Sequence, residues 1–279
     1  MTFGSLFSGI GGLDLGLERS GMTCKFQVEI DPFCRRVLAK HWPDVPKHDD
    51  VKTFPPTKPE DYSVDLICGG FPCQNLSFAG KGAGLEGERS GLWYEYARVI
   101  REIRPRFVLV ENVAALLNGS DEVEQPNDAC VCRRPYRRRL VCPACGRSMG
   151  DEPTQFVRRP WMGTVLGTLA SLGYDAEWLC LPAAAVGAPH IRDRVFLVAD
   201  RNNEGKPILS VDGEKWDWVQ VGHSREKWLL QEPEMGRVAH GVPAGIHRLR
   251  GLGNAVVPQL AELIGRRILN ASLSHLTQG

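Results

Sequence analysis

The sequence lacks any hydrophobic run long enough to cross a membrane, because no stretch of about 18 apolar residues occurs in it. Its N-terminus lacks the basic flank and the small-residue cleavage site of a secretion signal. It also lacks an excess of one charge: 34 Lys and Arg stand against 33 Asp and Glu. A near-neutral chain cannot coat DNA by bulk attraction. We therefore expect a cytoplasmic protein without membrane contacts, whose contacts with nucleic acid would come from a local basic patch.

Cysteine is present, but in a pattern that does not suit a disulfide framework. The chain has nine cysteines, an odd number, and four of them lie close together in one short segment. Disulfides are rare in the cytoplasm. The distribution indicates two or more separate uses of cysteine.

Strand and helix patterns alternate along most of the chain. A short strand, a glycine turn and an amphipathic helix ending at Gly21 come first, and a terminal amphipathic helix has apolar positions at Leu260, Leu263, Ile264 and Ile268. Apolar runs without alternation are typical of strands that helices cover on both faces. The pattern predicts a doubly wound, mostly parallel α/β sheet. Between these ends, strands are predicted over 25–31, 64–70, 106–113 and 193–199, and helices over 32–42, 91–103 and 161–172.

Two segments interrupt this alternation. Residues 118–158 are polar, rich in Cys and Arg, and without helical or strand period, so they are interpreted as an insertion. Residues 200–245 are polar and contain Trp without a long apolar run, which indicates a small second domain. Residues 1–199 would then form a catalytic, cofactor-binding domain, to which residues 246–279 return.

The glycine turn at Gly9, Gly11 and Gly12 suits a nucleotide-like cofactor, because glycine lets the backbone approach a ligand at a helix N-terminus. A tight turn without ligand would look the same. Glu29, at the end of the next strand, could accept both hydroxyls of a ribose, and Asp50 could meet an adenine amino group. As isolated charges, these two residues would more often be solvated.

Cys73 follows an apolar strand, in the crevice where open α/β sheets bind ligands. A buried, inert thiol is the commoner fate of a cysteine. Glu111 ends the next apolar strand at the same edge of the sheet. A thiolate that attacks a ring needs a partner to handle the charge developing there, and a carboxylic acid can do so. Cys73 and Glu111 therefore form a candidate catalytic pair.

The motif series "SLFSGIGGLDLGL", "VEIDP", "GGFPCQNLSFAG", "ENV", "RDRVFLVA" and "LGNAVVP" resembles that of the DNA cytosine carbon-5 methyltransferases. The match covers most of the chain outside the two irregular segments. Pro-Cys-Gln together with Glu-Asn-Val is highly specific, whereas the glycine turn alone is not. The resemblance implies a Rossmann-like fold that uses S-adenosylmethionine and acts on double-stranded DNA.

The resemblance also assigns roles in cofactor binding. Phe7 would stack on the adenine of S-adenosylmethionine, Glu29 would hold its ribose, and Asp50 would bond its amino group. Asn254 would close the pocket from the C-terminal end. Further cofactor contacts are expected at Gly9, Gly11, Ile30, Val51, Pro72 and Val256.

In the implied reaction, Cys73 attacks carbon 6 of a cytosine that has been flipped out of the duplex. Glu111 would protonate or hydrogen-bond ring nitrogen 3, and Arg194 would bind the cytosine carbonyl. Arg192 could support the loop or the flipped base, although a surface salt bridge of either arginine with Asp193 is the alternative. Gln74 and Ser77 would hold the loop on the DNA strand.

The chain departs from the family pattern in three places. The family usually has glutamine where this chain has His190, which puts that residue's role in doubt. The segment where the family keeps its target-recognition domain, here 200–245, is short. The motif that opens the region before "GNAV" is weak, with "EPEMGRVAHGVP" as its nearest counterpart.

The Cys-rich insertion could offset this small target-recognition region. Its four cysteines, C-x-C followed by "CPAC", could hold one structural zinc ion, although a loop with free thiols is the alternative. Between the two pairs lie five arginines around Tyr136, which suit phosphate contacts or minor-groove insertion but would also suit a solvated surface. The zinc ligands would be Cys130, Cys132, Cys142 and Cys145, and the arginines are Arg133, Arg134, Arg137, Arg138 and Arg139.

Other functions remain open from the sequence. A related tRNA methyltransferase shares Pro-Cys-Gln and Glu-Asn-Val, but its Cys-Phe-Thr motif is missing here. A catalytically silent DNA-binding protein and a nicotinamide-dependent oxidoreductase fit fewer of the motifs. We expect a monomer, with no stable complex with a cognate restriction endonuclease. The target sequence, the biological setting and a modified methyl donor are not determined.

Overall fold

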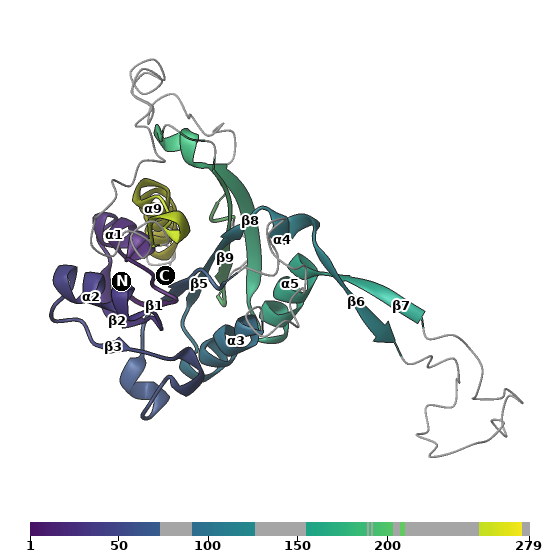
Figure 1. Ribbon diagram of the computed structural model, residues 1–279, viewed down its shortest axis with the longest axis horizontal. Helices are drawn as coiled ribbons and strands as arrows, with labels where there is room; N and C mark the ends of the chain where they lie inside the picture. The colour runs from purple at the N-terminus through teal and green to yellow at the C-terminus, as the bar shows by residue number, and fades with distance from the viewer. Residues whose placement is uncertain are drawn as a thin grey trace, which may run out of the picture.

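The computed structural model describes residues 1–72, 91–125, 155–188, 190, 192–202, 207–209 and 251–274. Within these ranges, no helix has both the length and the apolar character needed to span a bilayer. The described residues build one seven-stranded sheet, helices on its two faces, and a separate two-stranded ribbon (Figure 1).

The sheet confirms the predicted fold class. Its strand order is β3-β2-β1-β4-β5-β9-β8, in which the pairings from β3 to β5 are parallel, whereas β9 runs antiparallel to both β5 and β8. The order reverses between β1 and β4, and ligands of open α/β sheets bind at such a switch point. The strands are β1 (Thr2–Leu6), β2 (Thr23–Val28), β3 (Lys47–His48), β4 (Leu66–Gly69), β5 (Phe107–Val113), β8 (Asp175–Pro182) and β9 (Asp193–Asp200).

The helices begin and end close to the predicted positions. Asp31 caps α2 by accepting hydrogen bonds from the backbone nitrogens of Phe33 (2.7 Å) and Cys34 (3.4 Å), and Pro32 occupies the first turn, where no amide is needed. The α-helices are α1 (Gly12–Arg19), α2 (Pro32–His41), α3 (Leu92–Ile103), α4 (Ala115–Asn118), α5 (Trp161–Ser171) and α9 (Pro258–Ser274); the 3-10 turns are η1 (Val51–Thr53), η2 (Pro59–Tyr62) and η3 (Ala183–Val186).

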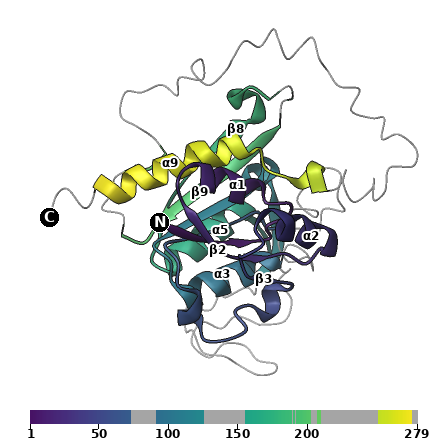
Figure 2. The ribbon, with the colours of Figure 1, turned by 90° about the vertical axis from the view of Figure 1, so that its left-hand side faces the viewer.

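Helices cover both faces of the sheet, so its central strands are buried on both sides. On one face, residues of α3 and α5, such as Trp93, Tyr96 and Val165, pack with those side chains of β4 and β5 that point the same way. On the other face, α1 and α9 cover the sheet (Figure 2). This double coverage explains why the strands carry apolar runs without alternation.

The C-terminal helix α9 lies directly on α1 (Figure 2). A Cβ atom on Gly16 would lie 2.3 Å from the carbonyl oxygen of Pro258 and 2.5 Å from the Cβ of Ala261, so glycine permits this close approach. Leu260, Ile264 and Ile268 are buried, as their spacing predicts, and Leu263 is only partly buried.

Two parts of the sequence interpretation were wrong. The insertion was expected to lack strand structure, but β6 (Ser120–Gln125) and β7 (Gln155–Pro160) pair as an antiparallel ribbon that projects from the body of the protein (Figure 1). The edge strand β8 was not predicted at all. Its residues before Leu181 are exposed or only partly buried, including Trp178 with 46% exposure, so its short apolar run is not one that is covered on both faces.

Candidate active site

The turn between β1 and α1 is built from residues in the left-handed backbone region. Phe7, Gly9 and Gly11 have φ values of 54°, 56° and 86°. A Cβ on Gly11 would lie 2.4 Å from the Trp42 ring, and one on Gly12 would lie 2.5 Å from the carbonyl oxygen of Val256. A Cβ on Gly9 would meet no atom within 4 Å, so the backbone there is open to a ligand.

Glu29 ties the end of β2 to this turn. Its Oε2 accepts a hydrogen bond from the Gly9 nitrogen at 2.7 Å, and its Oε1 accepts one from the Asp31 nitrogen at 2.8 Å. Burial raises the pKa of the Glu29 carboxyl, and the two amides partly offset that effect. A carboxylate has about four acceptor positions, so Glu29 can fix the turn and also accept ribose hydroxyls.

Ile30 and Asp50 complete this side of the site. Ile30 is 70% exposed although it is large and apolar, and it faces the same cavity as Phe7. Asp50 caps η1, since its Oδ1 accepts a hydrogen bond from the Lys52 nitrogen at 2.9 Å. An apolar surface beside a carboxylate suits a flat heterocycle that carries a hydrogen-bond donor.

The ends of β4 and β5 meet where the sequence predicts. Glu111 and Asn112 are buried at the end of β5, and Phe71 and Pro72 extend from β4. The Asn112 Nδ2 donates to the Phe71 carbonyl at 3.2 Å, and its Oδ1 accepts from the Val113 nitrogen at 2.9 Å. Asn112 therefore holds the backbone just before Cys73, a contact that the sequence analysis missed although it had singled out the Glu-Asn-Val motif.

The buried Glu111 forms an ion pair with the partly buried Arg194. The Arg194 Nε lies 2.9 Å from Oε1 of Glu111, and Arg194 also donates through Nη1 to the main-chain carbonyl of Asp193 at 2.8 Å. Burial raises the pKa of Glu111 to about 7, and the charges of Arg194 and Arg192 limit the rise. A carboxyl with this pKa can hold or release a proton near neutral pH. The Arg194 side chain thus contacts the backbone carbonyl of Asp193, and its ion pair is with the carboxylate of Glu111.

These groups face one cavity of about 550 Å³, a volume ordinary for a small-molecule site. It joins the glycine turn to Glu111 without interruption. Of the residues predicted to bind cofactor or to act in catalysis, those lining it are Phe7, Gly9, Glu29, Ile30, Asp50, Val51, Pro72, Glu111, Arg194, Asn254 and Val256.

Two predicted residues line a neighbouring cavity instead. Gly11 and Arg192 face a space of about 570 Å³ between α1, the end of α2 and η3. His190, which stands where the family usually has glutamine, lines the same space, and its Nδ1 is buried without a hydrogen-bond partner among the described residues. Arg192 still acts electrostatically on Glu111, because its charge lowers the pKa of that carboxyl.

The remaining predicted residues lie outside the described part of the chain. They are the nucleophile candidate Cys73, the loop residues Gln74 and Ser77, the cysteines Cys130, Cys132, Cys142 and Cys145, and the arginines Arg133, Arg134, Arg137, Arg138 and Arg139. In the ranges that the structure does describe, no group of three or more His, Cys, Asp or Glu side chains could hold a metal ion.

The fold is that of the Rossmann-like α/β class, and the cavity lies where the strand order of the sheet reverses. The family model for C-5 cytosine-specific DNA methylases matches residues 1–127 and 158–229. The chain therefore belongs to the C-5 cytosine-specific DNA methylase family, and most of the cofactor-binding and catalytic residues that the resemblance implied and that the structure describes line one cavity.

Individual relatives agree with this assignment. The chain is 33% identical to the type II methyltransferase M2.BsuMI of Bacillus subtilis, over 74% of this chain and 43% of that protein. It is 36% identical to the type II methyltransferase M.HhaI of Haemophilus parahaemolyticus, over 73% of this chain and 50% of that protein. The chain thus spans about half the length of these curated relatives.

A solved structure of a Spodoptera frugiperda DNMT2 variant superposes with a TM-score of 0.52. The two proteins share 19% identity, over 76% of this chain and 53% of that one. At this identity the likeness supports the fold alone.

Proposed function

We propose that this protein is a DNA cytosine carbon-5 methyltransferase that uses S-adenosylmethionine. The observation that carries the proposal is the buried Glu111, which pairs with Arg194 at 2.9 Å on the same cavity as the glycine turn and Pro72. A proton-handling carboxyl beside the residue that precedes Cys73 is the arrangement needed to activate a pyrimidine ring for attack by a thiolate.

The lining of the cavity fits the cofactor. Glu29 offers oxygen acceptors to ribose hydroxyls, Asp50 offers one to an adenine amino group, and Phe7 and Ile30 provide apolar surface. Asn254 and Val256 close the same cavity from the C-terminal side. When bound there, S-adenosylmethionine supplies an electrophilic methyl group.

The protein's own residues would activate the cytosine. The Cys73 thiolate forms a bond to carbon 6, and the electron pair of the 5,6 double bond shifts so that carbon 5 becomes nucleophilic. Glu111 donates a proton or a hydrogen bond to nitrogen 3, and Arg194 neutralises charge at the carbonyl oxygen. After methylation, a water molecule takes the proton from carbon 5, the electrons of that bond reform the double bond, Cys73 leaves as the thiolate, and nitrogen 3 returns its proton to Glu111.

The remaining parts of the chain have roles in this proposal that follow the sequence analysis. Gln74 and Ser77 hold the loop on the DNA, and Arg192 supports the loop or the flipped base. Residues 200–245 form a small target-recognition region, while 246–279 complete the catalytic domain. The four cysteines of the insertion bind one structural zinc ion, which elemental analysis of the purified protein would detect.

The proposal also includes a monomeric, cytoplasmic enzyme that forms no stable complex with a cognate restriction endonuclease. Light scattering of the purified protein checks the first point. A mass near that of one chain is expected, and a stable dimer would contradict it.

The deciding experiment is transfer of labelled methyl from S-adenosylmethionine to unmethylated duplex DNA and, separately, to tRNA. Bisulfite sequencing of the DNA product would identify the recognised sequence. Cys73→Ala should abolish transfer, whereas Cys180→Ala, at an exposed cysteine on β8, should leave it unchanged. Label in tRNA alone would move the protein to an RNA substrate, and transfer by Cys73→Ala would disprove the covalent route.

A second measurement traps the adduct. Duplex DNA with fluorine at carbon 5 of the target cytosine has no proton to lose there, so the bond between Cys73 and carbon 6 should persist after methylation. A denaturation-resistant complex is expected from the wild type, and none from Cys73→Ala.

A further inference from the structure

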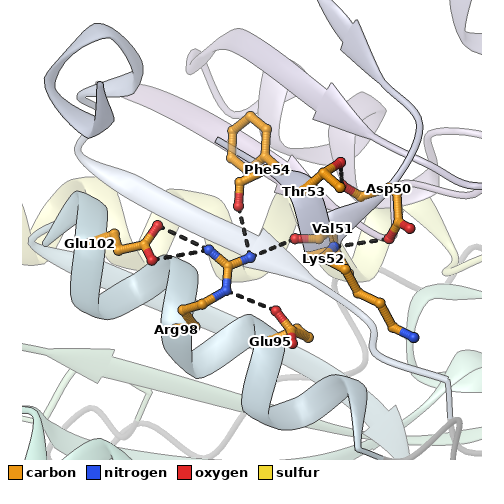
Figure 3. Close-up of polar contacts among 8 residues, drawn as sticks. All are labelled: Asp50, Val51, Lys52, Thr53, Phe54, Glu95, Arg98 and Glu102. Carbon is orange, nitrogen blue, oxygen red and sulfur yellow. Dashed lines mark hydrogen bonds and ion pairs between the residues drawn. The ribbon is translucent and has the colours of Figure 1, made fainter. Parts of the chain in front are cut away.

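Arg98 of α3 reaches across to the turn that bears Asp50 (Figure 3). Its Nη2 donates to the carbonyl oxygen of Val51 at 2.7 Å and to that of Phe54 at 2.8 Å. These carbonyls lie 47 and 44 residues before Arg98 in the sequence. The contact thus joins α3 to a turn that lies far from it in the sequence.

The other donors of the guanidinium are engaged by two glutamates on the same helix. Nε lies 2.8 Å from Oε2 of Glu95, and Nη1 lies 3.1 Å and 3.0 Å from the two oxygens of Glu102 (Figure 3). Glu95 and Glu102 are three residues before and four residues after Arg98, so all three side chains share one helix face. A guanidinium has five N–H donors in a planar fork, and this arrangement uses that whole set.

The turn that Arg98 contacts forms one wall of the cofactor cavity. Asp50 and Val51 line the cavity. Asp50 is the N-cap of η1, and Val51 is its first residue. Within the turn, the Asp50 carbonyl accepts from the Thr53 nitrogen at 3.2 Å, and the Val51 carbonyl accepts from the Phe54 nitrogen at 3.3 Å. A single 3-10 turn with such long hydrogen bonds is weakly held by itself. External donors to its carbonyls therefore matter for its position.

A second anchor keeps the turn folded without Arg98. Phe54 is 1% exposed, and its ring lies 4.9 Å from the rings of Phe26, Tyr62 and His48. This aromatic cluster holds the end of the turn in the core. Loss of the Arg98 contacts should therefore change the placement of Asp50 and Val51 without unfolding the protein.

We propose that Arg98 is a positioning residue for the cofactor, which sets the place of the Asp50 carboxylate against the adenine amino group. This inference rests on the proposed function, because it assumes that the cavity binds S-adenosylmethionine. Arg98 does not itself line the cavity; it acts through the backbone of Val51 and Phe54.

The test compares Arg98→Met with wild type. Methionine keeps the apolar stem and a good helix propensity but has no donors. Calorimetry should show S-adenosylhomocysteine binding about tenfold more weakly to Arg98→Met, equivalent to about 1.4 kcal/mol. S-inosylhomocysteine, which carries an oxo group in place of the amino group, should bind the two proteins alike. In turnover, KM for S-adenosylmethionine should rise while kcat is kept.

Arg101→Met is the matched control, because Arg101 is an exposed arginine on the same helix. It should bind both nucleosides as wild type does. Arg98→Lys offers one compact ammonium in place of the fork, so it should restore only part of the affinity. Thermal unfolding of each variant separates a binding effect from a loss of fold.

The outcomes distinguish the two proposals. If wild type binds no S-adenosylhomocysteine, the proposed function fails, and this inference fails with it. If wild type binds but Arg98→Met binds equally well, only the role of Arg98 is overturned. An equal loss of affinity for S-adenosylhomocysteine and S-inosylhomocysteine would also contradict positioning through Asp50. So would a fall in kcat at unchanged KM.

Discussion

Two opposing effects act on the pKa of the Glu111 carboxyl. Burial favours its protonated form, while the Arg194 and Arg192 charges favour the carboxylate, and the balance raises its pKa to about 7. A group poised in this way can donate a proton to a ring nitrogen and recover it within one turnover.

The first prediction concerns the pH dependence of methyl transfer. If protonated Glu111 is the active form, kcat should decline as pH rises through about 7, because the carboxyl then loses its proton. Glu111→Gln cannot transfer a proton. Its kcat should therefore be at least about 100-fold lower than that of the wild type, and it should show no alkaline decline. Rates measured from pH 6 to 9 test this. A decline that persists in Glu111→Gln would assign the titration to another group.

Asp14 is a second buried carboxyl, and it lies beneath the glycine turn. Its Oδ2 accepts from the Ser5 hydroxyl at 3.0 Å and its Oδ1 from Gln27 Nε2 at 2.7 Å. These bonds only partly offset the cost of burial, which raises the pKa from 3.8 to about 6. The folded protein therefore binds this proton more tightly than the unfolded chain does.

The second prediction follows from that difference. Between pH 4 and 6 the unfolded chain loses the proton first, so the free energy of unfolding should fall as pH rises, by about 3 kcal/mol, and then level off. Asp14→Asn can accept from Gln27 and donate to Ser5, so it should remove the part of this dependence that Asp14 contributes, while the part from Glu111 and Glu29, whose pKa values are also raised, remains. Urea unfolding from pH 4 to 8 measures it. Asp175→Asn, at an exposed aspartate, serves as the control, and identical curves for wild type and Asp14→Asn would refute the assignment.

The two buried acidic residues that sequence reasoning located share one feature, their position at the end of a predicted strand. Glu29 and Glu111 lie at the carboxyl ends of β2 and β5, where parallel strands bring functional groups together. Arg98 and Asn112 were missed as positioning residues. Each acts on a backbone carbonyl more than 40 residues away, and no local pattern encodes such a contact.

At the scale of elements, the packing of α9 on α1 depends on a glycine. A methyl group at Gly16 would lie 2.3 Å from the Pro258 carbonyl oxygen, so one helix would have to move. The helix carries Leu260 and Ile264 into the core, and residues just before it line the cofactor cavity. A shift of α9 should thus reach the cavity.

The third prediction uses a matched pair of substitutions. Gly16→Ala should lower the free energy of unfolding by about 1–3 kcal/mol through overpacking and should weaken cofactor binding. Gly167→Ala, in α5, places its methyl group where no atom lies within 4 Å. It should instead add up to about 1 kcal/mol through helix propensity. Chemical denaturation measures both, and equal effects of the two changes would rule out the packing argument.

Prediction of the elements succeeded where one physical signal dominated. Strands buried on both faces and helices with one apolar face have patterns that are easy to recognise, and the structure contains them near the expected residues. The edge strand β8 has only a short apolar run that is partly exposed, and the ribbon of β6 and β7 has none. A strand at an edge or outside the core needs no continuous apolar run, so only pairing with its neighbour defines it.

At the scale of the whole molecule, charge and shape bear on how the proposed DNA substrate would be held. The chain carries a formal net charge of only +1, so binding cannot rest on bulk attraction. The ribbon projects from the body of the protein (Figure 1), and the sequence between its two strands includes the arginine-rich stretch. In the sequence, this concentrated group of positive charge thus lies between the two strands of the ribbon.

The fourth prediction tests whether that charge contacts phosphates. Each phosphate that a protein neutralises on duplex DNA adds about 0.9 to the slope of log affinity against log salt concentration. If Arg133, Arg134, Arg137, Arg138 and Arg139 all contact phosphates, changing these five to alanine should reduce the slope by about 4 to 5. Binding is measured by fluorescence anisotropy from about 50 to 200 mM salt.

The control removes the same formal charge elsewhere. Alanine replaces five exposed basic residues on the body of the protein: Arg19, Lys25, Lys40, Lys58 and Arg101. If net charge alone governed binding, both variants would lose slope equally. We expect a large loss only from the arginine-rich stretch, because counterion release depends on direct neutralisation of phosphates and not on distant charge. An unchanged slope in that variant would mean that these arginines are solvated surface and that the DNA is held elsewhere.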